Sequence, residues 1–175
     1  EFQHYFVREQ CQPAISNYYF EGIDAARPQA QFLRQLRSQQ LDSIIICPSN
    51  PFLSIEPVLR LPGVRDAMIA NKAPVIAISP IVAGMALKGP AAKMMQELGM
   101  PATALAVAEF YGDLLDGMVI DDADAGLADS IEALGIEVLV CPTVMKTLQD
   151  RIVLAETALH FAGQLKHALH PEGSH

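Results

Sequence analysis

Short hydrophobic runs recur along the chain, and the segments between them are long enough to form helices. The runs are rich in Val and Ile and occur at 43–47, 74–79, 117–120 and 136–141. Runs without polar alternation are typical of strands that are buried on both faces of a parallel sheet. Their alternation with helices predicts an α/β fold, a Rossmann-like open parallel sheet with helices on both faces.

The intervening segments carry apolar residues at helical spacing. The expected helices cover 53–60 with 63–71, 89–99, 102–115, 127–134 and 148–169. Pro28 suits the first turn of a further helix before the first strand, and Asp150 suits the positive end of the last helix. Two short aromatic segments near the start, 5–7 and 18–20, predict a hairpin or an edge strand.

The composition is that of a globular domain. The chain has 175 residues, 51% of them hydrophobic, which is enough for one core. No apolar run approaches the roughly 20 residues that a membrane-spanning helix needs, so we expect no membrane partner. The net charge is −8, without a cluster of Lys and Arg, which argues against a nucleic-acid partner.

The cysteines and the two ends of the chain suggest where the protein works and which part of it is native. Cys11, Cys47 and Cys141 have neither metal-site nor disulfide spacing, which predicts a reducing, cytoplasmic compartment. Cys47 and Cys141 each end an apolar run, which predicts buried thiols for these two. Glu1 is not a methionine, so we expect the natural start to be missing. The end resembles a vector-derived tail, which leaves a domain at 2–170 and the tail at 171–175.

Polar residues follow the first two predicted strands where each strand ends. Pro48-Ser49-Asn50-Pro51 follows the first strand and Ser79-Pro80 follows the second. Ligands of open parallel sheets lie outside the carboxyl ends of the strands, and the prolines restrict the backbone there. Ser49 and Asn50 can therefore bind an amide edge, a hydroxyl or a phosphate oxygen. The alternative is an ordinary turn in which Ser or Asn caps the next helix.

A second candidate segment lies beyond Ser79, at Lys88-Gly89-Pro90. Gly89 can expose backbone N–H groups at the start of a helix, where anions bind, and Lys88 would add a positive charge. The order of residues is not that of a P-loop. The predicted nucleotide- and phosphate-binding residues are therefore Ser49, Asn50, Pro51, Ser79, Lys88 and Gly89.

The third predicted strand runs directly into an acidic segment, Asp121-Asp122-Ala123-Asp124. Carboxylates at the end of a strand can hold Mg²⁺, which prefers oxygen ligands, so Asp121 is the candidate metal ligand. The alternative is a solvated acidic loop. No Ser/His/Asp or Cys/His grouping has support in the sequence, so no catalytic residue is predicted.

Five motifs in order resemble the second half of the 2-phospho-L-lactate transferase family. They lie at 47–55, 61–65, 78–82, 86–91 and 115–121. Two segments near the start, 5–8 and 20–22, also fit that family. The resemblance covers most of residues 2–160.

The resemblance implies a step in the biosynthesis of the deazaflavin coenzyme F420. In that family a phospho-lactate or phosphoenolpyruvate group moves from a guanosine-diphospho-linked donor to the deazaflavin Fo, with release of GMP and dependence on Mg²⁺. By similarity, the diphosphate and guanosine side of the cleft would be formed by Ser49, Asn50, Ser79, Lys88 and Gly89. The resemblance also suggests a homodimer.

Members of the family are nearly twice as long, and their first half carries the glycine-rich nucleotide loop and the acidic residues that hold Mg²⁺ and Fo. We therefore expect this chain to be an incomplete portion of a larger domain that does not catalyse transfer alone.

Two alternative functions stay open. One is a nucleotide- or sugar-nucleotide-binding regulator that resembles the gluconeogenesis-factor proteins. The other is a non-catalytic fragment whose apolar helices serve subunit association.

Overall fold

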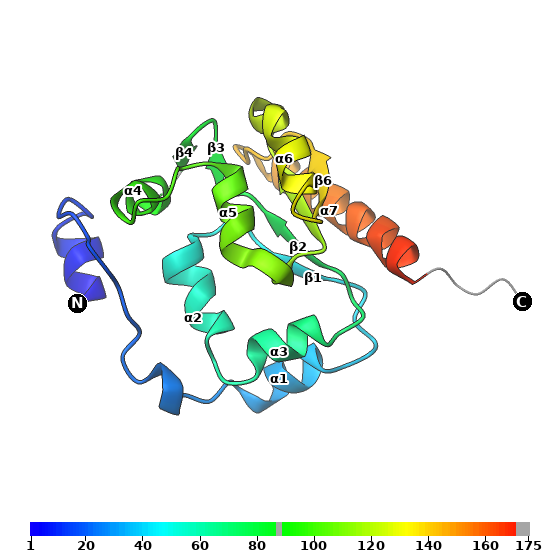
Figure 1. The fold of residues 1–175 in the computed structure, drawn as a ribbon, viewed down its shortest axis with the longest axis horizontal. Helices are drawn as coiled ribbons and strands as arrows, with labels where there is room; N and C mark the ends of the chain where they lie inside the picture. Colours follow the sequence, from blue (N-terminus) through cyan, green and yellow to red (C-terminus); the bar gives the residue numbers. More distant parts are fainter. Residues whose placement is uncertain (87–88, 171–175) are drawn as a thin grey trace, which may run out of the picture.

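A four-stranded parallel sheet forms the centre of the protein in the computed structural model, which describes residues 1–86 and 89–170. Its strands stand in the order β1-β2-β5-β6 (Figure 1). Their bounds are β1 (Ile44–Ile46), β2 (Val75–Ile78), β5 (Gly117–Ile120) and β6 (Glu137–Val140). All four lie inside the predicted runs, which confirms the Rossmann-like α/β prediction.

The helices lie in the connections between the strands. Before β1 come η1 (His4–Arg8), η2 (Ile23–Ala25) and α1 (Ala30–Leu36). The crossovers contain η3 (Pro51–Ile55), α2 (Glu56–Leu59), α3 (Val64–Ile69), α4 (Ala91–Glu97), α5 (Ala104–Tyr111), η4 (Gly112–Leu114), η5 (Asp122–Leu127) and α6 (Ala128–Glu132). The last helix is α7 (Leu148–Leu169), which has the predicted bounds.

The order of the strands decides which helices cover which face. Because consecutive strands are neighbours, right-handed crossovers place the helices between them on one face of the sheet. The other face is covered by α7 (Figure 1). Strand residues alternate accordingly: Ala77 and Met118 belong to the large core on the crossover side, whereas Ile76 and Val119 pack against α7.

The sheet and α7 approach each other most closely at Gly117, the first residue of β5. A Cβ atom at this position would lie 2.6 Å from Cδ1 of Leu165 and 2.8 Å from Cε1 of Phe161. Both side chains are buried in the layer between α7 and the sheet. Gly117 therefore allows α7 to pack directly on the middle of the sheet.

Polar contacts stabilise both ends of α7. At its start, the hydroxyl of Thr147 accepts from the N–H of Asp150 at 3.2 Å, and the Asp150 carboxylate accepts from the N–H of Thr147 at 2.7 Å. The backbone N–H groups of Thr147 and Lys146 hold the pKa of Asp150 below its usual value. This reciprocal capping box explains why the predicted start of the helix is correct.

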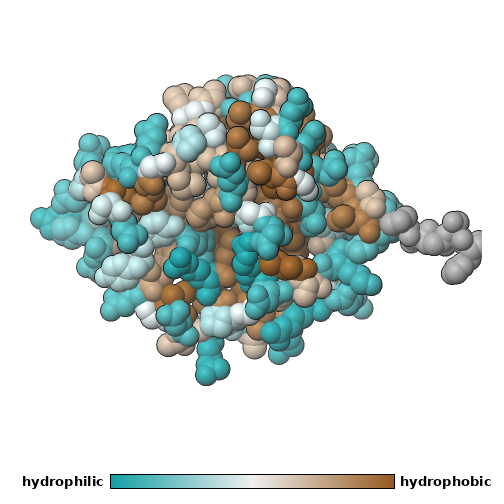
Figure 2. Space-filling view, in the orientation of Figure 1, coloured by the Kyte–Doolittle hydropathy of each residue, from teal (hydrophilic) through white to brown (hydrophobic). Residues whose placement is uncertain are grey.

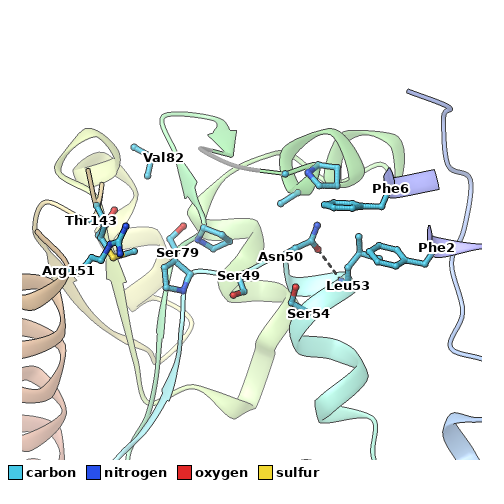
Figure 3. A pocket seen from close by; sticks show the side chains of 16 residues that line it. Phe2, Phe6, Ser49, Asn50, Leu53, Ser54, Ser79, Val82, Thr143 and Arg151 are labelled. Carbon is cyan, nitrogen blue, oxygen red and sulfur yellow. Dashed lines mark hydrogen bonds between the residues drawn. The ribbon is translucent and has the colours of Figure 1, made fainter. Parts of the chain in front are cut away.

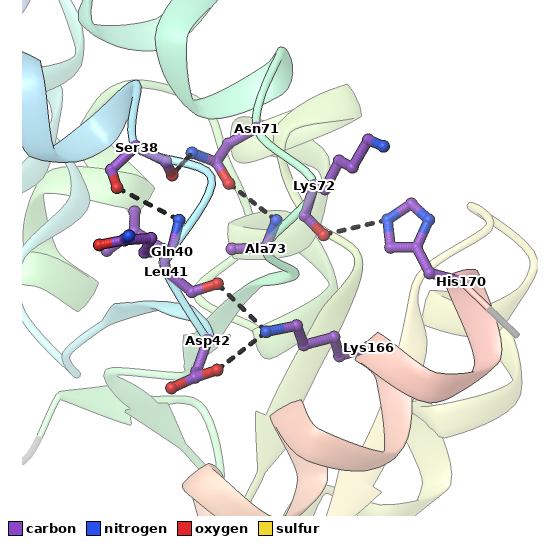
Figure 4. A network of polar contacts seen from close by, with 9 residues as sticks. All are labelled: Ser38, Gln40, Leu41, Asp42, Asn71, Lys72, Ala73, Lys166 and His170. Atoms are coloured by element: carbon purple, nitrogen blue, oxygen red, sulfur yellow. Dashed lines mark hydrogen bonds and ion pairs between the residues drawn. The ribbon is translucent and has the colours of Figure 1, made fainter. Parts of the chain in front are cut away.

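At the other end of α7, Lys166 and His170 contact the segments that lead into β1 and β2 (Figure 4). The ammonium of Lys166 donates to the carbonyl of Leu41 at 3.3 Å and to the carboxylate of Asp42 at 2.8 Å. Nε2 of His170 lies 3.1 Å from the carbonyl oxygen of Lys72. These contacts join the end of the helix to the amino-terminal edge of the sheet.

Beside them, Asn71 holds the end of α1 against the turn before β2 (Figure 4). Its side-chain nitrogen donates to the carbonyls of Leu36 at 2.6 Å and Ser38 at 2.9 Å. Its side-chain oxygen accepts from the N–H of Ala73 at 2.9 Å. One amide side chain thus satisfies three backbone groups in a connection that has no regular structure.

The predicted aromatic hairpin near the start is wrong. Residues 4–8 form the helix η1, and residues 18–20 have no regular secondary structure. The rings of Phe2 and Phe6 stack one turn apart on the helix, and the ring of Tyr18 packs edge-on against Phe52. The Tyr18 hydroxyl also donates to Glu56 of α2. These contacts with helices outweigh the strand propensity of aromatic residues.

A hairpin that the sequence analysis did not predict follows β2. Its strands are β3 (Ile81–Val82) and β4 (Met85–Ala86), and they pair antiparallel. The two residues between them, Ala83 and Gly84, both have positive φ, 50° and 76°, as a type I′ turn requires. The N–H of Ala83 donates to the Asp124 carboxylate at 3.0 Å, which supports this conformation at a residue other than glycine.

Two further observations concern the thiols and the surface. Cys47 is exposed and Cys11 and Cys141 are half-buried, so the prediction of buried thiols is wrong for Cys47, whose strand ends one residue earlier.

Figure 2 shows polar residues around the periphery and hydrophobic residues over α6 and β6 and beside α7. Among the described residues, no helix combines the length and the apolar character needed to cross a membrane.

Candidate functional site

A pocket of about 600 Å³ lies at the carboxyl ends of β1 and β2 (Figure 3). Ser49 and Asn50 line it from the loop after β1, and Ser79 lines it from the end of β2. Gly89 joins them from the segment before α4. Four of the predicted binding residues therefore lie together at the edge of the sheet where open α/β folds bind ligands.

The two polar atoms of the Asn50 side chain, Oδ1 and Nδ2, have different roles. Its Oδ1 accepts from the N–H groups of Phe52 at 3.0 Å and Leu53 at 3.1 Å and so caps η3. The one acceptor that the described residues offer its Nδ2 is the sulfur of Met94 at 3.5 Å, which is a weak acceptor. The helix-cap alternative is thus realised by the oxygen, while the NH₂ group remains able to donate to a ligand. Pro51 is buried at the first position of η3 and does not line the pocket.

The two serines differ in what their hydroxyls can do. Ser79 is 2% exposed, and its hydroxyl donates to the carbonyl of Ile81 at 2.8 Å and accepts from the N–H of Ile81 at 3.1 Å. Its side chain therefore shapes the turn into β3. Ser49 is half-buried, and within the described part of the chain its hydroxyl has no hydrogen-bond partner. Ser49 is the better ligand donor of the two.

Gly89 lines the pocket from the segment before α4 and has a φ of +73°. A Cβ there would meet no atom within 4 Å, so the backbone conformation, rather than space, favours glycine. The helix that follows, α4, begins at Ala91 and has no side-chain cap. Lys88, the sixth predicted residue, lies outside the described residues.

The sequence analysis missed the aromatic wall of the pocket. Phe6 lines it from η1 and Phe2 from the turn just before η1, with ring centroids 5.3 Å apart and ring planes 25° from parallel. Figure 3 shows both rings on the side of the pocket where Asn50 and Leu53 lie. Because 5–7 was predicted as a strand, nothing in the pattern placed these rings near the strand ends.

The opposite wall was missed as well. Thr143 and Met145 line the pocket from the loop after β6, and Arg151 lines it from the first turns of α7 (Figure 3). A signal for this wall was present, because Cys-Pro-Thr at 141–143 repeats the Cys-Pro-Ser of 47–49 at the end of another strand. Among the described residues of the lining, Arg151 is the one with a charged side chain, and its guanidinium forms no ion pair within 1–86 and 89–170.

Comparisons with known proteins identify the family. The family model described as 2-phospho-L-lactate transferase CofD matches residues 1–146. The chain belongs to the 2-phospho-L-lactate transferase family. The phosphoenolpyruvate transferase of Kitasatospora aureofaciens is 38% identical over 167 residues, 95% of this chain and 51% of that protein. The 2-phospho-L-lactate transferase of Methanocaldococcus jannaschii is 34% identical over 165 residues, 94% of this chain and 51% of that protein. The chain thus spans about half the length of these relatives.

The candidate Mg²⁺ ligand follows β5 directly, and its carboxylate is hydrogen-bonded in this structure. Asp121, the candidate ligand, accepts from the N–H and the hydroxyl of Thr143 at 2.8 and 3.0 Å and from the N–H of Ala123 at 3.1 Å. Burial raises the pKa of Asp121, but these hydrogen bonds outweigh it and bring the pKa below its usual value. Apart from 87–88 and 171–175, the chain contains no group of three His, Cys, Asp or Glu side chains that could hold a metal ion. In this structure Asp121 ties the β6 loop to β5.

Proposed function

We propose that this chain forms the guanosine-diphosphate-binding part of a transferase in coenzyme F420 biosynthesis. The transferase moves a phospho-lactate or phosphoenolpyruvate group from a guanosine-diphospho-linked donor to the deazaflavin Fo and releases GMP. Family membership and the names of the relatives support the reaction class. The observation that carries the proposal is the pocket that collects Ser49, Asn50 and Gly89 at the carboxyl edge of the sheet.

The pocket offers hydrogen-bond donors of the kind that a diphosphate needs. The Ser49 hydroxyl and the Asn50 NH₂ group donate to phosphate oxygens, and α4 begins beside Gly89 without a side chain to occupy its first N–H groups. In phosphoryl transfer the protein mainly positions the reactants and stabilises charge on the phosphate oxygens. Donors held by η3 and the strand end are suited to that task because their positions are fixed.

Mg²⁺ and the acceptor complete the proposed reaction. A bound Mg²⁺ neutralises charge on the diphosphate. Because the described residues bring no ligand set together, we assign its ligands to the part of the relatives that this chain does not cover. We therefore expect these 175 residues to bind nucleotide without transferring the phospho-acid to Fo. Turnover by the purified chain in a fluorescence assay of Fo would contradict this expectation.

Asn50→Asp tests the proposal sharply because it separates the two functions of this side chain. Aspartate keeps the oxygen that caps η3, but it removes the NH₂ donor and adds a negative charge beside the diphosphate. We expect the affinity for GDP, measured by calorimetry, to fall by about tenfold or more, because a hydrogen bond to a charged group is lost. The stability of the chain should change little.

Asn17→Asp is the matched control. Asn17 is exposed, and its side-chain oxygen accepts from the N–H of Tyr18 at 2.8 Å, an interaction that aspartate also keeps. It makes the same change of charge outside the pocket lining. If both variants lowered the affinity for GDP equally, the effect of Asn50→Asp would come from the change in net charge alone. That result would remove the main support for the proposal.

A further inference from the structure

The chemistry of the pocket changes along its length (Figure 3). Phe2 and Phe6 form one end, and Asn50 and Ser49 lie between the two ends. Arg151 lies at the other end, beside the loop after β6. An aromatic wall, a stretch of neutral hydrogen-bond donors and a cation therefore follow one another across a single cavity.

The aromatic end suits a planar ring. Phe2 is 48% exposed and Phe6 is 42% exposed, although both are large apolar side chains and already stack on each other. An aromatic ring that packs on such a pair gains dispersion and stacking energy without needing a polar partner. A nucleoside base fits this end through stacking, since the described residues that form it are the two phenyl rings.

The opposite end suits a carboxylate. Arg151 is exposed on α7, and a guanidinium presents a planar fork that matches the two oxygens of a carboxylate. The neighbouring acid, Asp150, is occupied by the N–H groups of Lys146 and Thr147. Asp121 is likewise occupied by Thr143. The charge of Arg151 is therefore available to an anion in the pocket.

We propose that the donor binds in one orientation, with its base over Phe2 and Phe6, its diphosphate beside Ser49 and Asn50, and the carboxylate of its three-carbon acid on Arg151. The identity of the donor rests on the proposed function. Base, diphosphate and acid follow one another in the donor in the same order as the aromatic wall, the neutral donors and the guanidinium in the pocket. Arg151 is thus the residue that selects a carboxylate-bearing group.

The test is a calorimetric titration of the chain with three probes: guanosine, GDP and phosphoenolpyruvate. Arg151→Ala should weaken the binding of phosphoenolpyruvate by about tenfold and change that of guanosine and GDP by less than about twofold. Arg151→Lys should give an intermediate loss, because the charge remains and the fork is lost. Phe2→Ala should show the reverse pattern, with guanosine and GDP weakened by about three- to tenfold.

Arg34→Ala and Phe32→Ala are matched controls, since both side chains are exposed on α1 and neither lines the pocket. Helical circular dichroism checks that α7 persists, as expected for alanine at an exposed helical position. If Arg151→Ala weakens GDP as much as phosphoenolpyruvate, the orientation is refuted while the proposed function stands. Binding of phosphoenolpyruvate that needs Arg151, without any binding of GDP, would keep the carboxylate assignment and refute the guanosine donor. Binding of neither GDP nor phosphoenolpyruvate overturns both.

Discussion

The contact between α7 and the sheet at Gly117 yields a quantitative prediction. Replacing Gly117 by alanine places a methyl group 2.6 Å from Cδ1 of Leu165 and 2.8 Å from Cε1 of Phe161. Neither atom can swing into solvent, because Leu165 and Phe161 are each only 6% exposed and pack against Ile76 and Val119. The methyl group must therefore push α7 away from β5 or force these side chains from their preferred rotamers.

Overpacking of this kind costs about 1–3 kcal/mol of the free energy of unfolding. For a chain of this size, such a loss lowers the melting temperature by roughly 2–12 °C. Gly163→Ala is the matched control on α7 itself, because a Cβ at Gly163 would meet no atom within 4 Å. Alanine inside a helix is favoured over glycine, so this variant should gain about 0.5–1 kcal/mol.

Urea unfolding followed by circular dichroism measures both changes. The reasoning predicts opposite signs for Gly117→Ala and Gly163→Ala. It also predicts that Leu165→Ala combined with Gly117→Ala costs less than the sum of the two single substitutions, since truncating Leu165 removes the atom that the new methyl group would meet. A Gly117→Ala variant as stable as the wild type would refute the close packing of α7 on the sheet.

Two further predictions concern polar groups. Because the folded-state pKa of Asp121 lies below its unfolded value, its hydrogen bonds stabilise the fold above about pH 4, and that contribution is lost as the pH falls through the folded pKa. Urea unfolding between about pH 5 and 2 should thus show a shallower pH dependence for Asp121→Asn than for the wild type, and equal slopes would contradict this. Asn71→Ala leaves the carbonyls of Leu36 and Ser38 without their donor and should cost about 1–3 kcal/mol, whereas Lys166→Ala breaks a surface ion pair worth at most about 1 kcal/mol. The reverse order in thermal melting would count against the network in Figure 4.

The strands and the last helix could be predicted because their signals are local. The buried runs at 74–79 and 117–120 contain few polar residues, as strands covered on both faces require. The start of α7 carries a threonine with an acid three residues later, and its apolar stripe continues to Leu169. Where the local pattern is this strong, tertiary packing does not change the secondary structure that the pattern predicts.

The first segment and the hairpin after β2 depended on tertiary contacts instead. Strand propensity at 5–7 and 18–20 was overruled by ring packing on helices. The strands β3 and β4 have two residues each, too few for any periodicity to show. Their turn relies on the Asp124 carboxylate, which reaches Ala83 from 41 residues further along the chain.

The pocket was predictable on one side only. Ser49 and Asn50 follow a strand directly, so the rule for open parallel sheets located them. Arg151 lies about a hundred residues away in sequence, and it reaches the pocket only because β6 stands in the same sheet and α7 folds back across its face. This packing determines which residue of the long helix faces the pocket. No local sequence pattern marks that residue.

The most direct test of the account is a calorimetric titration of this chain with GDP, in the presence and in the absence of Mg²⁺. The account predicts saturable binding of one GDP per chain, displaced by GMP and weakened by Asn50→Asp. It also predicts that binding persists without Mg²⁺, because the described residues supply no metal ligand set. Absence of GDP binding to this chain under both conditions would contradict the claim that the pocket at the ends of β1 and β2 is a guanosine-diphosphate site.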